Sequence, residues 1–261
     1  MPYWRQHMFQ KHQTISLAVL LSLGLASVAH SDELMNNDDE WRFSVAPYIW
    51  AASVRGDVGH PRVGTHFVES EFSDIIKDVD LAAMIMGSAR KGAYSVLMDV
   101  MYVNSSVTQR LPAGFPASNL KAKGKVITGF VGAGYTVYST DTVRLDTVVG
   151  LRGWHADIDL GLHGGPFNGI SATTKKNWVD ITAGLRGLYR FNDEFSVTYW
   201  GLAGGGQAKS DWDLALLGNW AINKDLTVTA GYRAIGVDYR KNGYVYDIVQ
   251  KGPMIGLTFK F

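Results

Sequence analysis

The sequence predicts an all-β fold, a transmembrane antiparallel up-and-down β-barrel of about ten strands, from three observations. Apolar and polar residues alternate with a period of two from Trp41 onward, as strands with one lipid-facing side require. Short polar breaks alternate with longer ones, which is typical of bacterial barrels with short periplasmic turns and longer external loops. The last segment ends on an aromatic residue, Phe261.

Composition and charge narrow the class of protein. The 261 residues suit one domain, and 29 Gly with 12% aromatic residues favour a sheet with many tight turns. No uninterrupted apolar stretch of about 18 residues follows the N-terminal region, so we expect no transmembrane helix in the mature chain. The 25 basic and 24 acidic residues nearly balance and do not indicate nucleic-acid binding. The chain has no cysteine, which excludes disulfides and thiolate metal sites.

The N-terminal region has the pattern of a secretory signal peptide. Arg5 and Lys11 precede an apolar run, 15–29, that ends in small residues. The run is too short, and too closely followed by polar residues, for a retained anchor. We therefore expect a signal peptide over 1–31 and a barrel over 32–261, located in the bacterial outer membrane after export.

Two details of this region have alternatives. Cleavage could follow Ala29 or Ser31, and translation could start at Met1 or at Met8. The predicted barrel is the same in each case.

Ten strands follow from the alternation. We expect them at 41–55, 80–90, 93–107, 121–138, 142–158, 174–190, 195–209, 211–222, 226–240 and 244–261. An even number of antiparallel strands places both ends of the barrel on the periplasmic side. The segment 64–72, which could be an additional short strand, therefore belongs to the first external loop.

The connections give the direction of each strand. The short ones are Arg90-Lys91-Gly92, Ser139-Thr140-Asp141, Asn192-Asp193-Glu194 and Asn223-Lys224-Asp225. The external ones are 56–79, 108–120 and 159–173, with tight connections near Ser210 and at Asn242-Gly243. No tandem repeat or second domain is visible.

The final strand carries the most specific local pattern. Apolar Ile255, Leu257, Phe259 and Phe261 alternate with small or polar residues. A C-terminal strand ending in Phe resembles the signal by which the barrel assembly machinery of the outer membrane recognises its clients. We therefore expect that machinery to be a partner, with Phe259 and Phe261 as its signal.

Asn242-Gly243 sets the register of the last hairpin, because both residues tolerate the positive φ of a type I′ turn. Positions whose numbers sum to 485 then pair. The pairs Leu226–Phe259, Val228–Leu257 and Ala230–Ile255 form a lipid-facing surface, and Arg233 lies on the other face. The same register puts Asp238 opposite Asp247, a like-charge pair that is destabilising by itself.

A second register predicts charges inside the barrel. If the loop 159–173 is centred near Pro166, Arg152 pairs with Asp180 and Asp146 pairs with Arg186. A basic residue on the lipid face costs about 2–4 kcal/mol at the midplane, so these side chains must point inward. We expect a lumenal network of Asp99, Arg144, Asp146, Arg152, Asp180, Arg186 and Arg233. It could form an ion-selective constriction or a solute site, but small barrels are mostly filled by side chains, which favours a plugging and stiffening role.

Two groups of surface residues fit a membrane setting. Aromatic residues near strand ends are expected to form interfacial girdles: Trp41, Tyr102, Tyr135, Tyr189, Trp212, Trp220, Tyr232 and Phe261. Lysines near the external rim could meet the phosphates of lipopolysaccharide, an expected partner beside the membrane lipid, or could simply be solvated: Lys121, Lys123, Lys125, Lys175 and Lys176.

The sequence gives little support for catalysis. His155, Asp157 and Asp159 share one face where a strand leaves the membrane, and an imidazole beside carboxylates could activate water or hold a cation weakly. His60, His66 and His163 are the other histidines of the mature chain. No zinc motif or Gly-x-Ser-x-Gly accompanies them, so a polar strand end is the preferred interpretation, and we expect no metal or cofactor.

The chain resembles a widespread group of uncharacterised outer-membrane proteins of Proteobacteria over most of its mature length. The resemblance rests on Pro47-Tyr48-Ile49-Trp50, Phe72-Ser73-Asp74-Ile75, Asp99 with Tyr102, Gly150-Leu151-Arg152, Gly184-Leu185-Arg186, Gly231-Tyr232-Arg233 with Asp238-Tyr239, and Gly252-Pro253-Met254-Ile255-Gly256 before Phe261. It implies an envelope location and a barrel, and no reaction. Where relatives have Gly-Asp before a glycine-rich stretch, this chain has Gly201-Leu202-Ala203 before Gly204-Gly205-Gly206, so any site using that Asp is altered here.

These patterns lead to one functional hypothesis and two alternatives. The first is a non-enzymatic integral barrel that acts as a narrow or plugged pore or as an envelope-structural protein. The second is an outer-membrane hydrolase that acts on lipid A or peptides through His155 and Asp157. The third is adhesion by the loops 56–79 and 159–173.

Overall fold

The computed structural model describes residues 40–60, 64–111 and 113–261, and the predicted signal peptide lies outside them. The described strands are β1 (Arg42–Trp50), β2 (Ser53–His60), β3 (Gly64–Ser70), β4 (Val79–Lys91), β5 (Tyr94–Arg110), β6 (Asn119–Ser139), β7 (Val143–His163), β8 (Ser171–Arg190), β9 (Phe195–Gly206), β10 (Ser210–Ala221), β11 (Leu226–Lys241) and β12 (Tyr244–Lys260). One short helix, α1 (Phe72–Asp78), precedes β4. Within the described part of the chain, no helix is long and apolar enough to cross a membrane.

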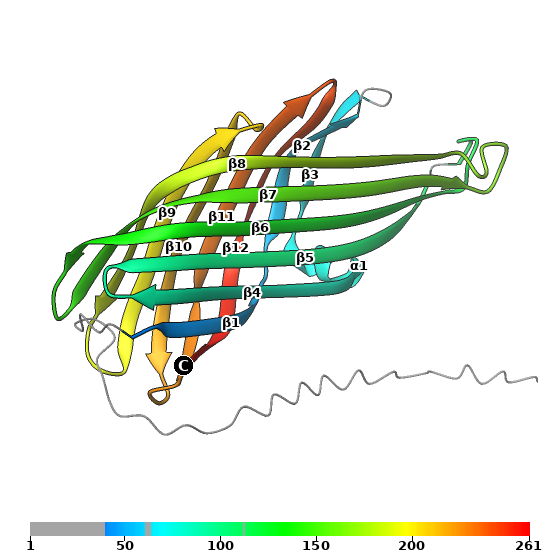
Figure 1. Ribbon diagram of the computed structural model, residues 1–261. Helices are drawn as coiled ribbons and strands as arrows, with labels where there is room; N and C mark the ends of the chain where they lie inside the picture. The colour runs from blue at the N-terminus through cyan, green and yellow to red at the C-terminus, as the bar shows by residue number, and fades with distance from the viewer. Residues whose placement is uncertain (1–39, 61–63, 112) are drawn as a thin grey trace, which may run out of the picture. The chain divides into compact units, whose positions relative to one another are not determined.

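Ten strands form a closed antiparallel barrel, as predicted (Figure 1). β4 to β12 pair in chain order, and β1 closes the ring because it pairs with β4 on one side and with β12 on the other. Short connections join β4–β5, β6–β7, β8–β9 and β10–β11 at one end, which we call the turn end; the opposite end is the loop end. The first and last strands of the barrel, β1 and β12, meet at the turn end, where Phe43 and Phe261 exchange backbone hydrogen bonds.

Both predicted registers are confirmed. Asn242 and Gly243 have φ values of 52° and 77°, and β11 pairs with β12 from Leu226↔Phe259 to Lys241↔Tyr244. Asp238 does lie opposite Asp247, but Arg240 contacts both carboxylates, with its Nε 2.7 Å from Asp238. The guanidinium therefore offsets the like-charge pair.

The first predicted strand, 41–55, is two strands that follow β12 in one continuous register. β1 pairs with β12 up to Trp50↔Met254, and β2 resumes at Ser53↔Lys251. The pairing of β1 with β4 ends at Pro47↔Ile85, and β2 pairs instead with β3, which lies outside the ten-stranded ring. The segment predicted as a possible strand at 64–72 is β3, and the region 56–79 is a hairpin followed by α1.

Strands β5 to β8 are longer than the alternation predicted. Their ladders continue to Arg110↔Asn119 and Gly161↔Ser171, so both ends of each predicted loop, 108–120 and 159–173, are paired strand and the connections shorten to 111–118 and 164–170. β8 pairs with β9 only up to Asp180↔Gly206, which leaves its first residues bonded to β7 alone. β5, β6, β7 and β8 therefore extend beyond the other strands at the loop end, as Figure 1 shows.

The outer surface of the barrel is an apolar band with an aromatic girdle at the turn end. Outward Val149, Leu151, Val179 and Ile181 are about half exposed although they are apolar. At the turn end, exposed rings pack in pairs across neighbouring positions: Trp41 with Phe43, Tyr94 with Tyr135, Tyr189 with Phe191 and Phe195 with Trp220. On β7 the outward face carries no charged residue over 143–153. At about 3.3 Å per residue and a strand tilt of about 40°, this segment spans roughly 25 Å along the barrel axis.

Candidate functional site: a charged network inside the barrel

Arg233 on β11 is the centre of a buried network that crosses the lumen. Its side chain is 2% exposed. Its Nη2 lies 2.5 Å from Asp99 of β5 and 2.7 Å from Asp213 of β10, and its Nη1 donates to the hydroxyl of Tyr48 on β1. Tyr48 in turn donates to Asp99 over 2.8 Å. Because β5 and β11 are not neighbours in the barrel, these bonds tie opposite walls together.

Arg152 on β7 extends the network to a second wall. Its Nη2 lies 2.7 Å from Asp213, and its Nη1 lies 3.3 Å from Asp211. Asp213 therefore serves two guanidinium groups. The indole N–H groups of Trp154 and Trp200 donate to Asp211 and Asp213 over 2.8 and 2.9 Å, so the carboxylates have neutral donors as well.

Aromatic rings enclose both guanidinium groups. The Arg233 Cζ lies 5.6 Å from the ring centre of Trp50 and 5.5 Å from that of Trp200, and the Arg152 Cζ lies 5.6 Å from that of Phe130. Rings at this distance attract a cation through their quadrupole and exclude water from it. The charges are thus held by fixed partners in an apolar interior.

A second charged cluster lies nearer the turn end. Arg90 donates to Asp146 and, over 2.9 Å, to Thr136, which donates to Asp146 over 2.7 Å. The Arg144 Nε lies 3.7 Å from the same carboxylate. The two clusters have opposite imbalances: carboxylates outnumber guanidinium groups around Arg233 and Arg152, and guanidinium groups outnumber the carboxylate here.

Most of the predicted network lies in these two clusters, with different ion-pair partners. Arg152 is opposite Asp180, and Asp146 is opposite Arg186, as the register predicted. The ion pairs of Arg152 nevertheless go to Asp211 and Asp213, while Asp180 accepts a hydrogen bond from the backbone N–H of Ala208. The predicted pairing of Arg152 with Asp180 is therefore correct for the backbone and wrong for the side chains.

Sequence reasoning missed four members of the network: Asp211, Asp213, Arg90 and Tyr48. Asp211 and Asp213 alternate with the outward Leu214 and Leu216, so the period of two on β10 could have placed them inside. Arg90 was assigned to a turn, and Tyr48 was noted only as part of a motif. Their roles depend on which strands lie opposite each other across the lumen. The pairing of neighbouring strands does not give this information.

Several buried polar atoms near Arg152 have unused hydrogen-bonding capacity. Within the described residues no hydrogen-bond partner reaches Oδ2 of Asp180 or the hydroxyls of Thr128 and Thr182. Oδ1 of Asp211 has the ion pair with Arg152 and no hydrogen bond. Such atoms can be satisfied by ordered water or by a small polar solute. This is the part of the network where the predicted alternative, a solute or ion site, would have to lie.

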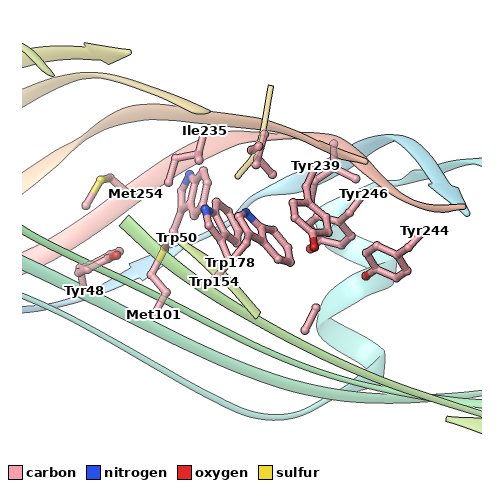
Figure 2. Close-up of a cluster of buried hydrophobic side chains, with 14 of the residues drawn as sticks. Tyr48, Trp50, Met101, Trp154, Trp178, Ile235, Tyr239, Tyr244, Tyr246 and Met254 are labelled. Atoms are coloured by element: carbon pink, nitrogen blue, oxygen red, sulfur yellow. The ribbon is translucent and has the colours of Figure 1, made fainter. Parts of the chain in front are cut away.

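Aromatic side chains fill the lumen on the loop-end side of the network (Figure 2). The ring of Trp178 lies between those of Trp154 and Tyr239, at 5.7 and 4.4 Å between centres and within 14° of parallel. Tyr246 meets both indoles edge-on, and Tyr244 meets Tyr239 in the same way. Each of these five side chains is at most 5% exposed, so they form a packed aromatic layer that joins β7 and β8 to β11 and β12.

The candidate catalytic residues His155 and Asp157 are directed to separate partners. The Nδ1 of His155 lies 2.5 Å from Oδ1 of Asn177, and Asp157 is ion-paired with Lys175 over 2.9 Å. The hydrogen bond and the charge of Asp157 raise the pKa of Lys175 above its usual value. Asp159 accepts from Thr173 over 2.5 Å.

Of the remaining histidines, only His163 has a side chain that the structure describes. His163 is exposed at the end of β7, and the side chains of His60 and His66 lie outside the described residues. Among the side chains that the structure describes, no group of three or more His, Asp or Glu is arranged to hold a metal ion.

The comparisons with known proteins identify the fold. No family model matches the sequence, and no curated protein matches it either. Among solved structures, the outer membrane protease OmpT from Escherichia coli is 12% identical, with a TM-score of 0.55 over 88% of this chain and 99% of that one. Neisserial surface protein A (13%, TM-score 0.34, 84% and 97%) and Ail of Yersinia pestis (11%, 0.37, 86% and 100%) also match. At this identity the likeness to OmpT concerns the fold, a closed β-barrel.

Proposed function

We propose that this chain is an integral barrel of the bacterial outer membrane, with a lumen plugged by its own side chains and an envelope-structural rather than a conducting role. The observation that carries the proposal is the Arg233 network, in which β1, β5, β10 and β11 are tied together across the lumen.

The membrane location is supported by the two faces of the strands. The outward face is apolar over a height of roughly 25 Å and carries aromatic pairs at its turn end, which matches the band and girdle of outer-membrane barrels. The inward face carries the buried charges. A basic residue on the lipid face would cost about 2–4 kcal/mol at the midplane of the bilayer. The expected export signal and the C-terminal Phe agree with this location.

The plugged lumen is supported by burial. Arg152, Asp213, Arg233 and Trp178 are at most 2% exposed, so their side chains fill the space rather than line an open channel. Barrels of this size are close to the limit at which side chains fill the interior. The bonds across the lumen join walls that the backbone ladders do not connect, so they should also stiffen the barrel.

Conductance in planar bilayers tests this proposal. Wild-type protein should show no discrete steps, because the stacked rings and ion pairs obstruct the lumen. Trp154→Ala combined with Trp178→Ala removes two rings of the obstructing layer and should produce measurable steps. The control, Leu151→Ala combined with Val179→Ala, truncates outward residues of the same two strands and should remain silent.

Steady wild-type steps that the two tryptophan substitutions leave unchanged would contradict the plugged lumen. The outer-membrane location is tested separately by separating the inner and outer membranes of cells that express the protein, and the protein should be found in the outer-membrane fraction.

A further inference from the structure

The outward face of β5 to β8 changes from apolar to charged at one level. On the turn-end side of this level stand Val100, Leu151 and Val179, all exposed and apolar. On its loop-end side, Lys125 of β6 is flanked in register by Asn104 of β5 and Asp157 of β7. Since the apolar band ends here, this level corresponds to the headgroups of the outer leaflet if the barrel spans the membrane as proposed.

Three lysines form a row immediately beyond this level. Lys121, Lys123 and Lys125 alternate along β6 and therefore share its outward face, about 6.6 Å apart. Lys123 and Lys125 are exposed. Within the described residues, none of the three has an ion pair. The ammonium groups are thus available for an external anion.

Lys125 is also held at the edge of the band. Its Nζ lies 5.6 Å from the ring centre of Tyr102, which stands on the neighbouring strand. A cation over an aromatic ring at an interface keeps its charge next to the headgroups while its aliphatic stem covers apolar surface. This lysine is therefore positioned toward the membrane rather than toward bulk solvent.

The acids beside the lysines already have partners. Asp157 pairs with Lys175 over 2.9 Å, and Asp159 accepts a hydrogen bond from Thr173. Counting Lys121, Lys123, Lys125 and Lys175 against these two acids leaves an excess of positive charge on this face. We call these four lysines the lysine face.

We propose that the lysine face binds the phosphate groups of lipid A-type headgroups in the outer leaflet. The inference rests on the proposed membrane location, because it requires the loop end to face the outer leaflet. Ammonium groups pair with phosphate as point charges, and a row of them can engage several phosphates of one headgroup or of neighbours. The site is open, convex and continuous with the lipid-facing band, which suits a lipid already lying against the barrel better than a dissolved anion.

The experiment measures binding of defined lipids to the purified full-length barrel in neutral detergent by native mass spectrometry. The lipids are bisphosphorylated lipid A, the same lipid with both phosphates removed, and zwitterionic phosphatidylethanolamine. The test variant is Lys121→Gln/Lys123→Gln/Lys125→Gln. The control, Lys91→Gln/Lys224→Gln/Lys260→Gln, removes the same charge at the turn end. Retained folding of each variant is checked by the heat-dependent shift of its gel mobility.

We expect the wild type and the turn-end control to bind bisphosphorylated lipid A at least about tenfold more tightly than the lysine variant, since each lysine near a charged membrane surface contributes about a factor of five. Raising the salt concentration should narrow the difference. The dephosphorylated lipid should bind all three proteins weakly and equally.

Equal binding of bisphosphorylated lipid A by the wild type and the lysine variant would overturn the inference, as would equal weakening by the two triple variants. A wild type that prefers none of the three lipids would also overturn it. None of these results affects the proposed plugged barrel, which fails only if the protein does not insert into membranes or conducts without substitution.

Discussion

At the scale of single residues, the interior depends on carboxylates that serve more than one guanidinium group. Asp213 is the clearest case, because both Arg152 and Arg233 contact it and its side chain is 2% exposed. Removing one partner of a buried ion pair usually costs more than the pair contributes, since the other charge stays buried without compensation.

Asp213→Asn should therefore lower the free energy of unfolding by about 3–5 kcal/mol, as measured by urea titration of the protein folded in lipid vesicles. Asn keeps the shape of the side chain, so the loss reports the charge. Asp193→Asn, in the exposed turn between β8 and β9, is the control and should change stability by less than about 0.5 kcal/mol. A loss below about 1 kcal/mol for Asp213→Asn would mean that the network contributes little to stability.

The residue scale also shows how far sequence reasoning reaches. Alternation and a loop centred near Pro166 correctly paired Arg152 with Asp180 and Asp146 with Arg186 along the backbone. The side-chain partners across the lumen were not predictable in this way. They depend on the curvature of the closed barrel, which brings β10 and β11 opposite β5 and β7, and no local pattern in the sequence encodes that distance.

At the scale of elements, the seam between β1 and β12 is the place where the barrel closes. Ala51 and Ala52 separate β1 from β2. The N–H of Ala51 still bonds to the carbonyl of Pro253 over 2.8 Å. A Cβ added to Gly252 would lie 2.0 Å from the Ala51 carbonyl oxygen, so the two backbones approach too closely for any side chain. Alternation over 41–55 looked uninterrupted, which is why a single strand was predicted.

Gly252→Ala should consequently weaken the seam and lower the free energy of unfolding by about 1–3 kcal/mol, the usual cost of overpacking. The measurement is again urea unfolding in vesicles. Gly129→Ala on β6 is the matched control, because a Cβ there would meet nothing within 4 Å and alanine fits the strand. If Gly252→Ala were as stable as Gly129→Ala, the seam would tolerate a wider separation than its hydrogen bonds indicate.

The lengths of the elements were the weaker part of the prediction. The predicted strands 121–138 and 142–158 included the lysines of β6 and Asp157, but the residues just beyond them, 119–120 and 159–163, were assigned to the external loops. Ladder hydrogen bonds continue through them, since a strand that has left an apolar layer still satisfies its backbone by pairing. Polarity marks where the strands leave the apolar band, and it does not mark where they end.

At the scale of the whole barrel, the direction of insertion follows from the unequal ends. The turn end has four short connections, and the loop end has the extended β5 to β8 and the lysine face. Outer-membrane barrels keep short turns in the periplasm and longer segments outside. We therefore predict that Ala113, at the loop end, faces the medium and that Asp193, at the turn end, faces the periplasm.

Cysteine labelling can test this direction without background, because the chain contains no cysteine. Ala113→Cys and Asp193→Cys both replace exposed residues in connections, so neither should disturb the barrel. A maleimide carrying a polymer too large to pass the outer membrane should label Ala113→Cys in intact cells. It should label Asp193→Cys only after the outer membrane is permeabilised. The reverse pattern would invert the barrel and place the lysine face in the periplasm, whereas labelling of both variants in intact cells would mean that the barrel does not separate the two compartments.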